Sequence, residues 1–93
     1  MSVTRINEFQ AQDGQGDALR DLLGSFVAAI ESSAGCRSCQ LLQSEDDPTR
    51  IVVIEVWESP EAHQAAVESI PTETFDQARE LLAGPPKGAY YRG

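Results

Sequence analysis

The clearest pattern in the chain is a stripe of apolar residues at helical spacing in its amino-terminal third. The members recur at i, i+3, i+4, i+7, i+8 and i+11, and this spacing places them on one face of a helix. They are Leu19, Leu22, Leu23, Phe26, Val27 and Ile30. Asp17 is a candidate N-cap, and Gly35 suits the left-handed residue that often closes a helix. The pattern predicts one amphipathic helix that packs on a sheet.

Four other segments show the period of two, or the β-branched content, that is typical of strands. The segment 50–58 is the richest in β-branched residues, and both of its faces are mostly apolar, with Glu55 among the apolar residues of one face. A turn at 46–49, with a proline at a favoured corner, predicts that the second and third strands form a hairpin. The predicted strands are 3–11, 36–45, 50–58 and 88–92.

The carboxyl-terminal third predicts two short helices. Ser59 and Pro60 provide a capping hydroxyl and a proline at the first helical position, which predicts a helix over 60–68. A second helix is expected over 71–83, before the stop at 84–86. The element order β-α-β-β-α-β predicts a single ferredoxin-like α+β domain over 1–93, with an antiparallel sheet and helices on one face.

Helices on one side leave the other face of such a sheet bare. We expect the bare face to include Trp57 and Phe9. A bare apolar face usually marks an interface. We therefore expect a homodimer in which two sheets close face to face around a barrel-like interior.

Composition narrows the classes of partner. A net charge of −8 and a pI of about 4.4 disfavour nucleic acid and anionic lipid. The longest apolar run, 51–54, is far below the roughly 20 residues of a membrane span. The first residues lack the pattern of a signal peptide, so we expect a cytoplasmic protein with reduced cysteines. Motifs for nicotinamide, flavin or nucleotide are not found, so we expect no cofactor.

Three runs of residues resemble a known family. They are 35–42, 46–48 and 54–65, and the strongest part is Glu-x-Trp-x-Ser-x-Glu-Ala-His over 55–63. They resemble the antibiotic biosynthesis monooxygenase family, which includes quinol monooxygenases. The resemblance implies a dimeric α/β barrel that acts without a cofactor on a small aromatic, quinol-like ligand and O₂.

The opening strand also resembles the haem-degrading branch of the same superfamily. Asn7 matches the asparagine that faces the haem in that branch. The haem-ligating histidine aligns with Phe75, however, and the haem-distorting tryptophan aligns with Ala66. Phenylalanine offers no axial ligand to iron, so haem degradation ranks lower.

His63, Glu55 and Asn7 are the candidate catalytic residues. His63 is the only histidine and titrates near neutrality, which suits a general acid or base, although a packed imidazole bonded to a backbone carbonyl is an equal alternative. Glu55 is either a base with a raised pKa or, as we favour, an ion-pair partner of Arg5 or Arg50. Asn7 would hold a phenolate or an oxygen species, or would be an ordinary strand asparagine.

Three aromatic residues are candidates for substrate binding, namely Trp57, Phe9 and Tyr90. A tryptophan at the end of a central strand more often packs in the core or at a dimer interface, so packing is favoured for Trp57. The pair Cys36-x-x-Cys39 follows a helix carboxyl terminus, where the helix dipole opposes a thiolate. A metal or redox role is therefore disfavoured for the two thiols.

The leading hypothesis is a cofactor-independent monooxygenase that oxidises a phenolic or quinol-type molecule in a cavity enclosed by the dimer. In this scheme His63 or Glu55 takes the proton, Asn7 orients oxygen, and Trp57 with a tyrosine clamps the ring. The alternative is a non-catalytic dimer that binds a small apolar ligand or serves as an accessory subunit.

Overall fold

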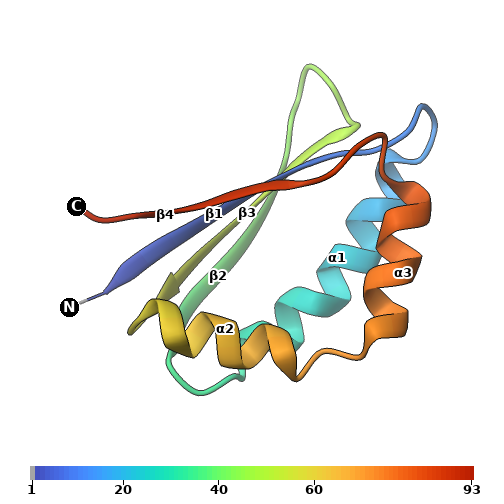
Figure 1. Cartoon of the computed structure of the whole chain (residues 1–93). Helices are drawn as coiled ribbons and strands as arrows, with labels where there is room; N and C mark the ends of the chain where they lie inside the picture. Colours follow the sequence, from blue (N-terminus) through green and yellow to red (C-terminus); the bar gives the residue numbers. More distant parts are fainter. Residues whose placement is uncertain (1) are drawn as a thin grey trace.

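A computed structural model describes residues 2–93, and it contains one four-stranded antiparallel sheet with three helices on one side (Figure 1). The strand order across the sheet is β2-β3-β1-β4. The strands are β1 (Val3–Gln10), β2 (Cys36–Gln43), β3 (Arg50–Trp57) and β4 (Lys87–Tyr91), and the helices are α1 (Gly16–Glu31), α2 (Pro60–Glu68) and α3 (Thr72–Leu81). The predicted ferredoxin-like α+β fold is confirmed.

The amphipathic stripe forms α1, which packs along the sheet beside α3. Its first residue, Gly16, lies so close to the backbone of Pro48 that a β-carbon there would collide with that carbonyl. The helix is preceded by Gln15, whose side chain makes no capping bond, so the prediction that Asp17 caps it is wrong. Asp17 lies within the first turn instead, where a negative charge suits the helix dipole. Gly35 has the predicted left-handed conformation, with φ of +84°.

Identifiable residues determine where α2 begins and where α3 ends. Ser59 accepts a hydrogen bond from the backbone N–H of Ala62, which confirms the predicted cap of α2. Helix α3 ends two residues earlier than predicted, because Leu82 is already extended and bridges to Ala11 beside the sheet. No helix within residues 2–93 combines the length and apolar character needed to cross a bilayer.

The prediction that Trp57 and Phe9 lie on the bare face of the sheet is wrong. Trp57 is fully buried and packs with Ala66 of α2 and Ile30 of α1, on the side that the helices cover. Phe9 packs against the cluster that contains Leu19 of α1. The odd-numbered residues of β1 and β3 therefore face the helices.

The opposite face carries the even-numbered residues of these two strands and is apolar over much of its area. Its apolar members are Ile6, Leu42, Val52, Ile54, Val56, Ala89 and Tyr91, as the strand registers require. Leu42 and Tyr91 are about half exposed. A bare apolar face exists as predicted, but none of the predicted site residues lies on it.

Candidate functional site

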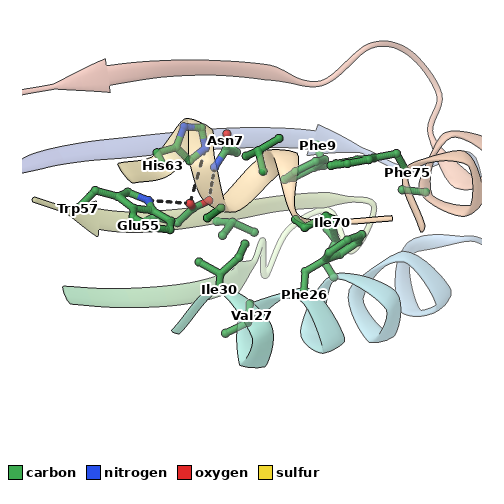
Figure 2. A pocket seen from close by; sticks show the side chains of 15 residues that line it. Asn7, Phe9, Phe26, Val27, Ile30, Glu55, Trp57, His63, Ile70 and Phe75 are labelled. Atoms are coloured by element: carbon green, nitrogen blue, oxygen red, sulfur yellow. Dashed lines mark hydrogen bonds and ion pairs between the residues drawn. The ribbon is translucent and has the colours of Figure 1, made fainter. Parts of the chain in front are cut away.

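A pocket of about 130 Å³ lies between the sheet and the three helices (Figure 2). Most of its wall is apolar, and polar groups gather at one end, where β1 and the carboxyl-terminal end of β3 meet α2. The lining residues are Asn7, Phe9, Leu23, Phe26, Val27, Ile30, Val53, Glu55, Trp57, His63, Ala66, Val67, Ile70, Phe75 and Ala78. Five of the six predicted site residues are thus brought together by three different elements, β1, β3 and α2. The sixth, Tyr90, contacts the group through His63.

Glu55 is the centre of the polar end. Its side chain is almost fully buried, and its two carboxylate oxygens accept hydrogen bonds from different donors. The amide Nδ2 of Asn7 donates at 2.6 Å, and the indole Nε1 of Trp57 donates at 2.9 Å. Burial raises the pKa of Glu55, while these two bonds and the charge of Arg5 act in the opposite direction without cancelling it. Glu55 is therefore a stronger base than an exposed carboxylate.

The predicted ion pair between Glu55 and an arginine is not formed among the described residues. Arg5 does lie opposite Glu55 in the ladder between β1 and β3. Its Nε donates instead to Oδ1 of Asn7 at 3.0 Å, and its guanidinium lies 4.7 Å from the centre of the Tyr90 ring. Arg50 lies opposite Gln10, at the far end of the sheet. The donors that hold the carboxylate are therefore neutral groups, the amide of Asn7 and the indole of Trp57.

His63 lies one turn into α2, where the Ser59 cap and Pro60 fix the start of the helix. Its Nδ1 is 2.6 Å from the hydroxyl of Tyr90, so the imidazole is held by a phenol and not by a backbone carbonyl. Its Nε2 is 3.9 Å from Glu55, too far for a hydrogen bond. Burial, and then the positive charge of Arg5, lower the pKa of His63.

The contact between His63 and Glu55 is close enough to count as an ion pair, but both pKa shifts oppose one. A lowered pKa favours neutral imidazole, and a raised pKa favours the neutral carboxyl group. We therefore treat the pair as a neutral histidine beside a carboxyl group that can gain or lose a proton.

Aromatic rings form the apolar part of the pocket. Phe26 of α1 and Phe75 of α3 are stacked, with ring centroids 6.1 Å apart. Trp57 makes an edge contact with His63, with centroids 5.6 Å apart, and its position in the core agrees with the favoured packing interpretation. The sequence predicted that Phe26 belongs to the inward stripe of its helix, but the helical pattern alone does not distinguish a core residue from a pocket wall.

The two cysteines lie on the pocket side of β2. A register shift between Cys36 and Ser38 sets both Cys36 and Cys39 opposite residues of β3 that face the helices, namely Trp57 and Glu55. Burial, reinforced by the negative charge of Glu55, raises the pKa of both thiols, to about 12 for Cys39. Both are free thiols, and within residues 2–93 no three metal-ligating side chains come together.

The family model named antibiotic biosynthesis monooxygenase matches residues 2–81. The chain therefore belongs to the antibiotic biosynthesis monooxygenase family. A protein of known structure from Mycobacterium tuberculosis superimposes with a TM-score of 0.87 at 27% identity, over 100% of this chain and 95% of that one.

SnoaB, a cofactor-independent oxygenase from Streptomyces nogalater, superimposes with a TM-score of 0.84 at 20% identity, over 99% of this chain and 92% of its own. At this identity the likeness shows the shared fold alone. A curated haem oxygenase of the mycobilin-producing type, also from Mycobacterium tuberculosis, is 35% identical over 65 residues, which is 70% of this chain. The match spans 62% of that relative's length.

The pocket does not fit a haem. An engineered cavity of about 150 Å³ holds one benzene, whereas a haem contains four pyrrole rings. The single imidazole in the pocket wall, His63, already bonds Tyr90 through Nδ1 and directs Nε2 toward Glu55. Phe75, at the position aligned with a haem-ligating histidine, is stacked on Phe26 and offers no donor.

Proposed function

We propose that the protein is a cofactor-independent monooxygenase that converts a small phenol to a quinone in the pocket between the sheet and the helices. One observation carries the proposal: a buried carboxyl group and an imidazole whose pKa is lowered by burial lie side by side at the polar end of an apolar, aromatic pocket. Family membership supports oxygenase chemistry. The proposed site is a pocket within one chain, and not the cavity between two subunits that the sequence suggested. The dimer remains a separate proposal, in which a second copy covers the bare face of the sheet.

The first step is removal of the phenol proton by Glu55. Burial raises the pKa of this carboxyl group and so brings its basicity closer to that of a phenolate. When Glu55 is ionised, its charge favours the tautomer in which His63 carries its proton on Nε2. The Tyr90 hydroxyl then donates to Nδ1, and the Nε2–H of His63 is available to the substrate oxygen.

The second step needs no electrons from outside the substrate. The phenolate transfers one electron to O₂, and the two radicals combine at the ring carbon para to the hydroxyl, which bears hydrogen, and form a C–O bond there. The proton held by Glu55 returns to give the hydroperoxide. Loss of the ring C–H proton and cleavage of the O–O bond then release water and leave a second carbonyl. The sum is phenol plus O₂ giving quinone plus water, so the substrate supplies all the electrons.

The apolar wall favours such a substrate and protects the intermediate. The stacked rings of Phe26 and Phe75 offer faces and edges to an aromatic ring. Exclusion of water by Val27 and Ile70 limits loss of superoxide from the radical pair. A pocket of 130 Å³ matches one ring, with any second ring extending toward its open side.

The test is oxygen uptake by chelator-treated protein with two sets of phenols. One set carries hydrogen on the ring carbon para to the hydroxyl, and the matched set carries a methyl group there. Quinone formation above buffer for the first set alone, at one quinone per O₂ and without hydrogen peroxide, is expected, because the methyl group leaves no ring C–H proton to be lost at that carbon. Glu55→Gln should lower turnover by at least 10²-fold, while Glu45→Gln, in the exposed turn after β2, should not change it. Equal turnover in Glu55→Gln refutes the scheme.

A second candidate function is binding without turnover. Among the described residues, every buried side-chain nitrogen and oxygen already has a hydrogen-bond partner, as a purely structural cluster would. Tight binding of a phenol, detected by quenching of Trp57, together with no oxygen uptake would favour this alternative. A Soret band on titration with haem would instead point to the haem oxygenase relative.

A further inference from the structure

Arg5 is the charged residue nearest the polar cluster that the scheme above does not use. It lies on β1 between two strands, opposite Glu55 of β3 and opposite Tyr90 of β4. Its Nε–H donates to Oδ1 of Asn7, and its guanidinium covers the face of the Tyr90 ring. One side chain thus contacts both the residue that bonds Glu55 and the residue that bonds His63.

The contact with Asn7 fixes which way the amide points. An asparagine amide has one acceptor atom and one donor group. In this structure Oδ1 accepts from Arg5, and Nδ2 donates to Glu55. Reversing the amide would set its NH₂ against the Arg5 N–H and its oxygen against the carboxylate, so both contacts would become repulsive. Arg5 therefore makes Asn7 a donor toward Glu55.

Gly88 of β4 provides the room for this arrangement. It lies opposite Asn7 in the ladder between β1 and β4. A β-carbon at this position would overlap Nη2 of Arg5, and it would lie 2.7 Å from Cζ of Arg5 and 2.9 Å from Oδ1 of Asn7. Both distances are shorter than any ordinary contact of a β-carbon. The absence of a side chain at Gly88 is what allows the guanidinium and the amide to lie together.

We propose that Arg5 is a positioning residue that acts through Asn7 to hold the Glu55 carboxylate in its proton-accepting state, in a space that Gly88 keeps open. The importance of this role for catalysis rests on the proposed function. The effect of Arg5 on the protonation of Glu55, however, can be measured without any substrate. Loss of Arg5 would free the amide to turn and would remove a donor from the ionised carboxylate.

The titratable groups around Glu55 come from four strands or helices. They are Arg5 on β1, Cys36 and Cys39 on β2, His63 on α2, and Tyr90 on β4, which acts through His63. Helices α1 and α3 contribute only apolar side chains to the pocket wall. Of these groups, only Arg5 keeps a positive charge over the whole pH range of the experiment, because a guanidinium does not release its proton there.

The sole tryptophan of the chain reports on Glu55, because the indole N–H of Trp57 donates to its carboxylate. We suggest following Trp57 fluorescence from pH 3 to 9 in the intact protein. The His63 ring is also near, so two transitions are expected, and the one that disappears in Glu55→Gln belongs to Glu55. Arg5→Leu should move that transition upward by about one pH unit. Arg50→Leu, which removes the same charge at the far end of the sheet, should not.

A double-mutant cycle separates positioning from simple charge. If Arg5 acts through Asn7, Arg5→Leu should shift the Glu55 transition by less than half as much when Asn7→Ala is already present. Gly88→Ala retains every charge, and it should raise the midpoint of the Glu55 transition as Arg5→Leu does. When the two substitutions are combined, the midpoint should rise no further than in Arg5→Leu alone. Circular dichroism checks that each variant is folded.

Three results would overturn the proposal: no shift in folded Arg5→Leu, an equal shift with and without Asn7, or no shift in Gly88→Ala. If instead the shifts occur but oxygen uptake is absent, the proposed function fails and the positioning role stands.

Discussion

Glu55→Gln should change how stability depends on pH, because it removes one buried titrating group while keeping the shape of the side chain. In the folded state burial raises the pKa of Glu55 above the ordinary value of 4.5. Between these two pKa values the folded state keeps a proton that the unfolded state has released. The native protein should therefore lose stability as pH rises through this window, starting near pH 4.5, and the variant should not.

Two contributions set the size of the effect. The glutamine oxygen can accept from Trp57, but its NH₂ group faces the Nδ2 donor of Asn7, so the variant loses the bond made at 2.6 Å. An unmet buried donor costs about 1–3 kcal/mol, and this cost does not depend on pH. Against it, each unit by which the folded pKa exceeds the unfolded one destabilises the native protein at high pH by about 1.36 kcal/mol.

The assay is urea unfolding at several pH values between 4 and 8, extrapolated linearly to water. The variant should be the less stable protein at pH 4, and the gap should narrow as pH rises. His63 is present in both proteins, so its titration cancels to first order in the difference. Glu45→Gln, an exposed position, controls for the loss of one negative charge. A gap that widens with pH would mean that the hydrogen bonds outweigh burial, and the account of Glu55 as a strengthened base would be wrong.

Three further predictions test other parts of the structure. Gly16→Ala should cost about 1–3 kcal/mol of unfolding free energy, because its β-carbon meets the backbone of Pro48. Gly24→Ala in the same helix should instead raise the unfolding free energy by about 0.5–1 kcal/mol, since nothing lies within 4 Å of the added carbon. If the urea midpoints of both variants shifted in the same direction, this prediction would be contradicted. The single histidine, His63, should titrate below 6.5 by proton NMR, and stability should fall as pH drops through that window because the unfolded chain binds the proton first. Cys39, with its pKa raised to about 12, should react with iodoacetamide at pH 8 roughly 10³-fold more slowly in the folded protein than in urea, and equal rates would show that it is not shielded.

The elements of the fold could be predicted from the sequence because they depend on local patterns. The stripe from Leu19 to Ile30 fixes α1, and the hydroxyl of Ser59 with Pro60 fixes the start of α2. The end of α3 was missed by two residues, since Leu82 leaves the helix to bridge to Ala11, a contact across more than 70 positions.

The face of the sheet was predicted wrongly for a physical reason. Strand β3 is apolar on both sides, with Val53 and Trp57 on one and Val52 and Ile54 on the other. A period of two assigns residues to opposite faces but does not say which face the helices cover. In the structure the buried residues alternate along β3 and all have odd numbers, so the odd-numbered face is the one that the helices cover. The sequence alone does not contain this information.

The contacts of the site were harder to predict than its members. Glu55 and His63 were chosen for their chemistry and Asn7 for its match to the family pattern, and the three do lie together. The partners were not foreseen, because the sequence suggests that Arg5 or Arg50 forms an ion pair with Glu55. The guanidinium turns instead toward Asn7, where the missing side chain of Gly88 leaves space. A glycine in a strand indicates a close approach by a neighbour, but it does not name the neighbour.

The sheet separates the pocket from the bare apolar face that carries Leu42 and Tyr91. A second copy bound to that face would contact the backs of the same strands that hold Asn7 and Glu55, and would reach neither side chain. Substitutions on the two faces can therefore be selected separately. The subunit contact could diverge while the chemistry is kept, or the pocket could accept a new molecule while the assembly stays the same.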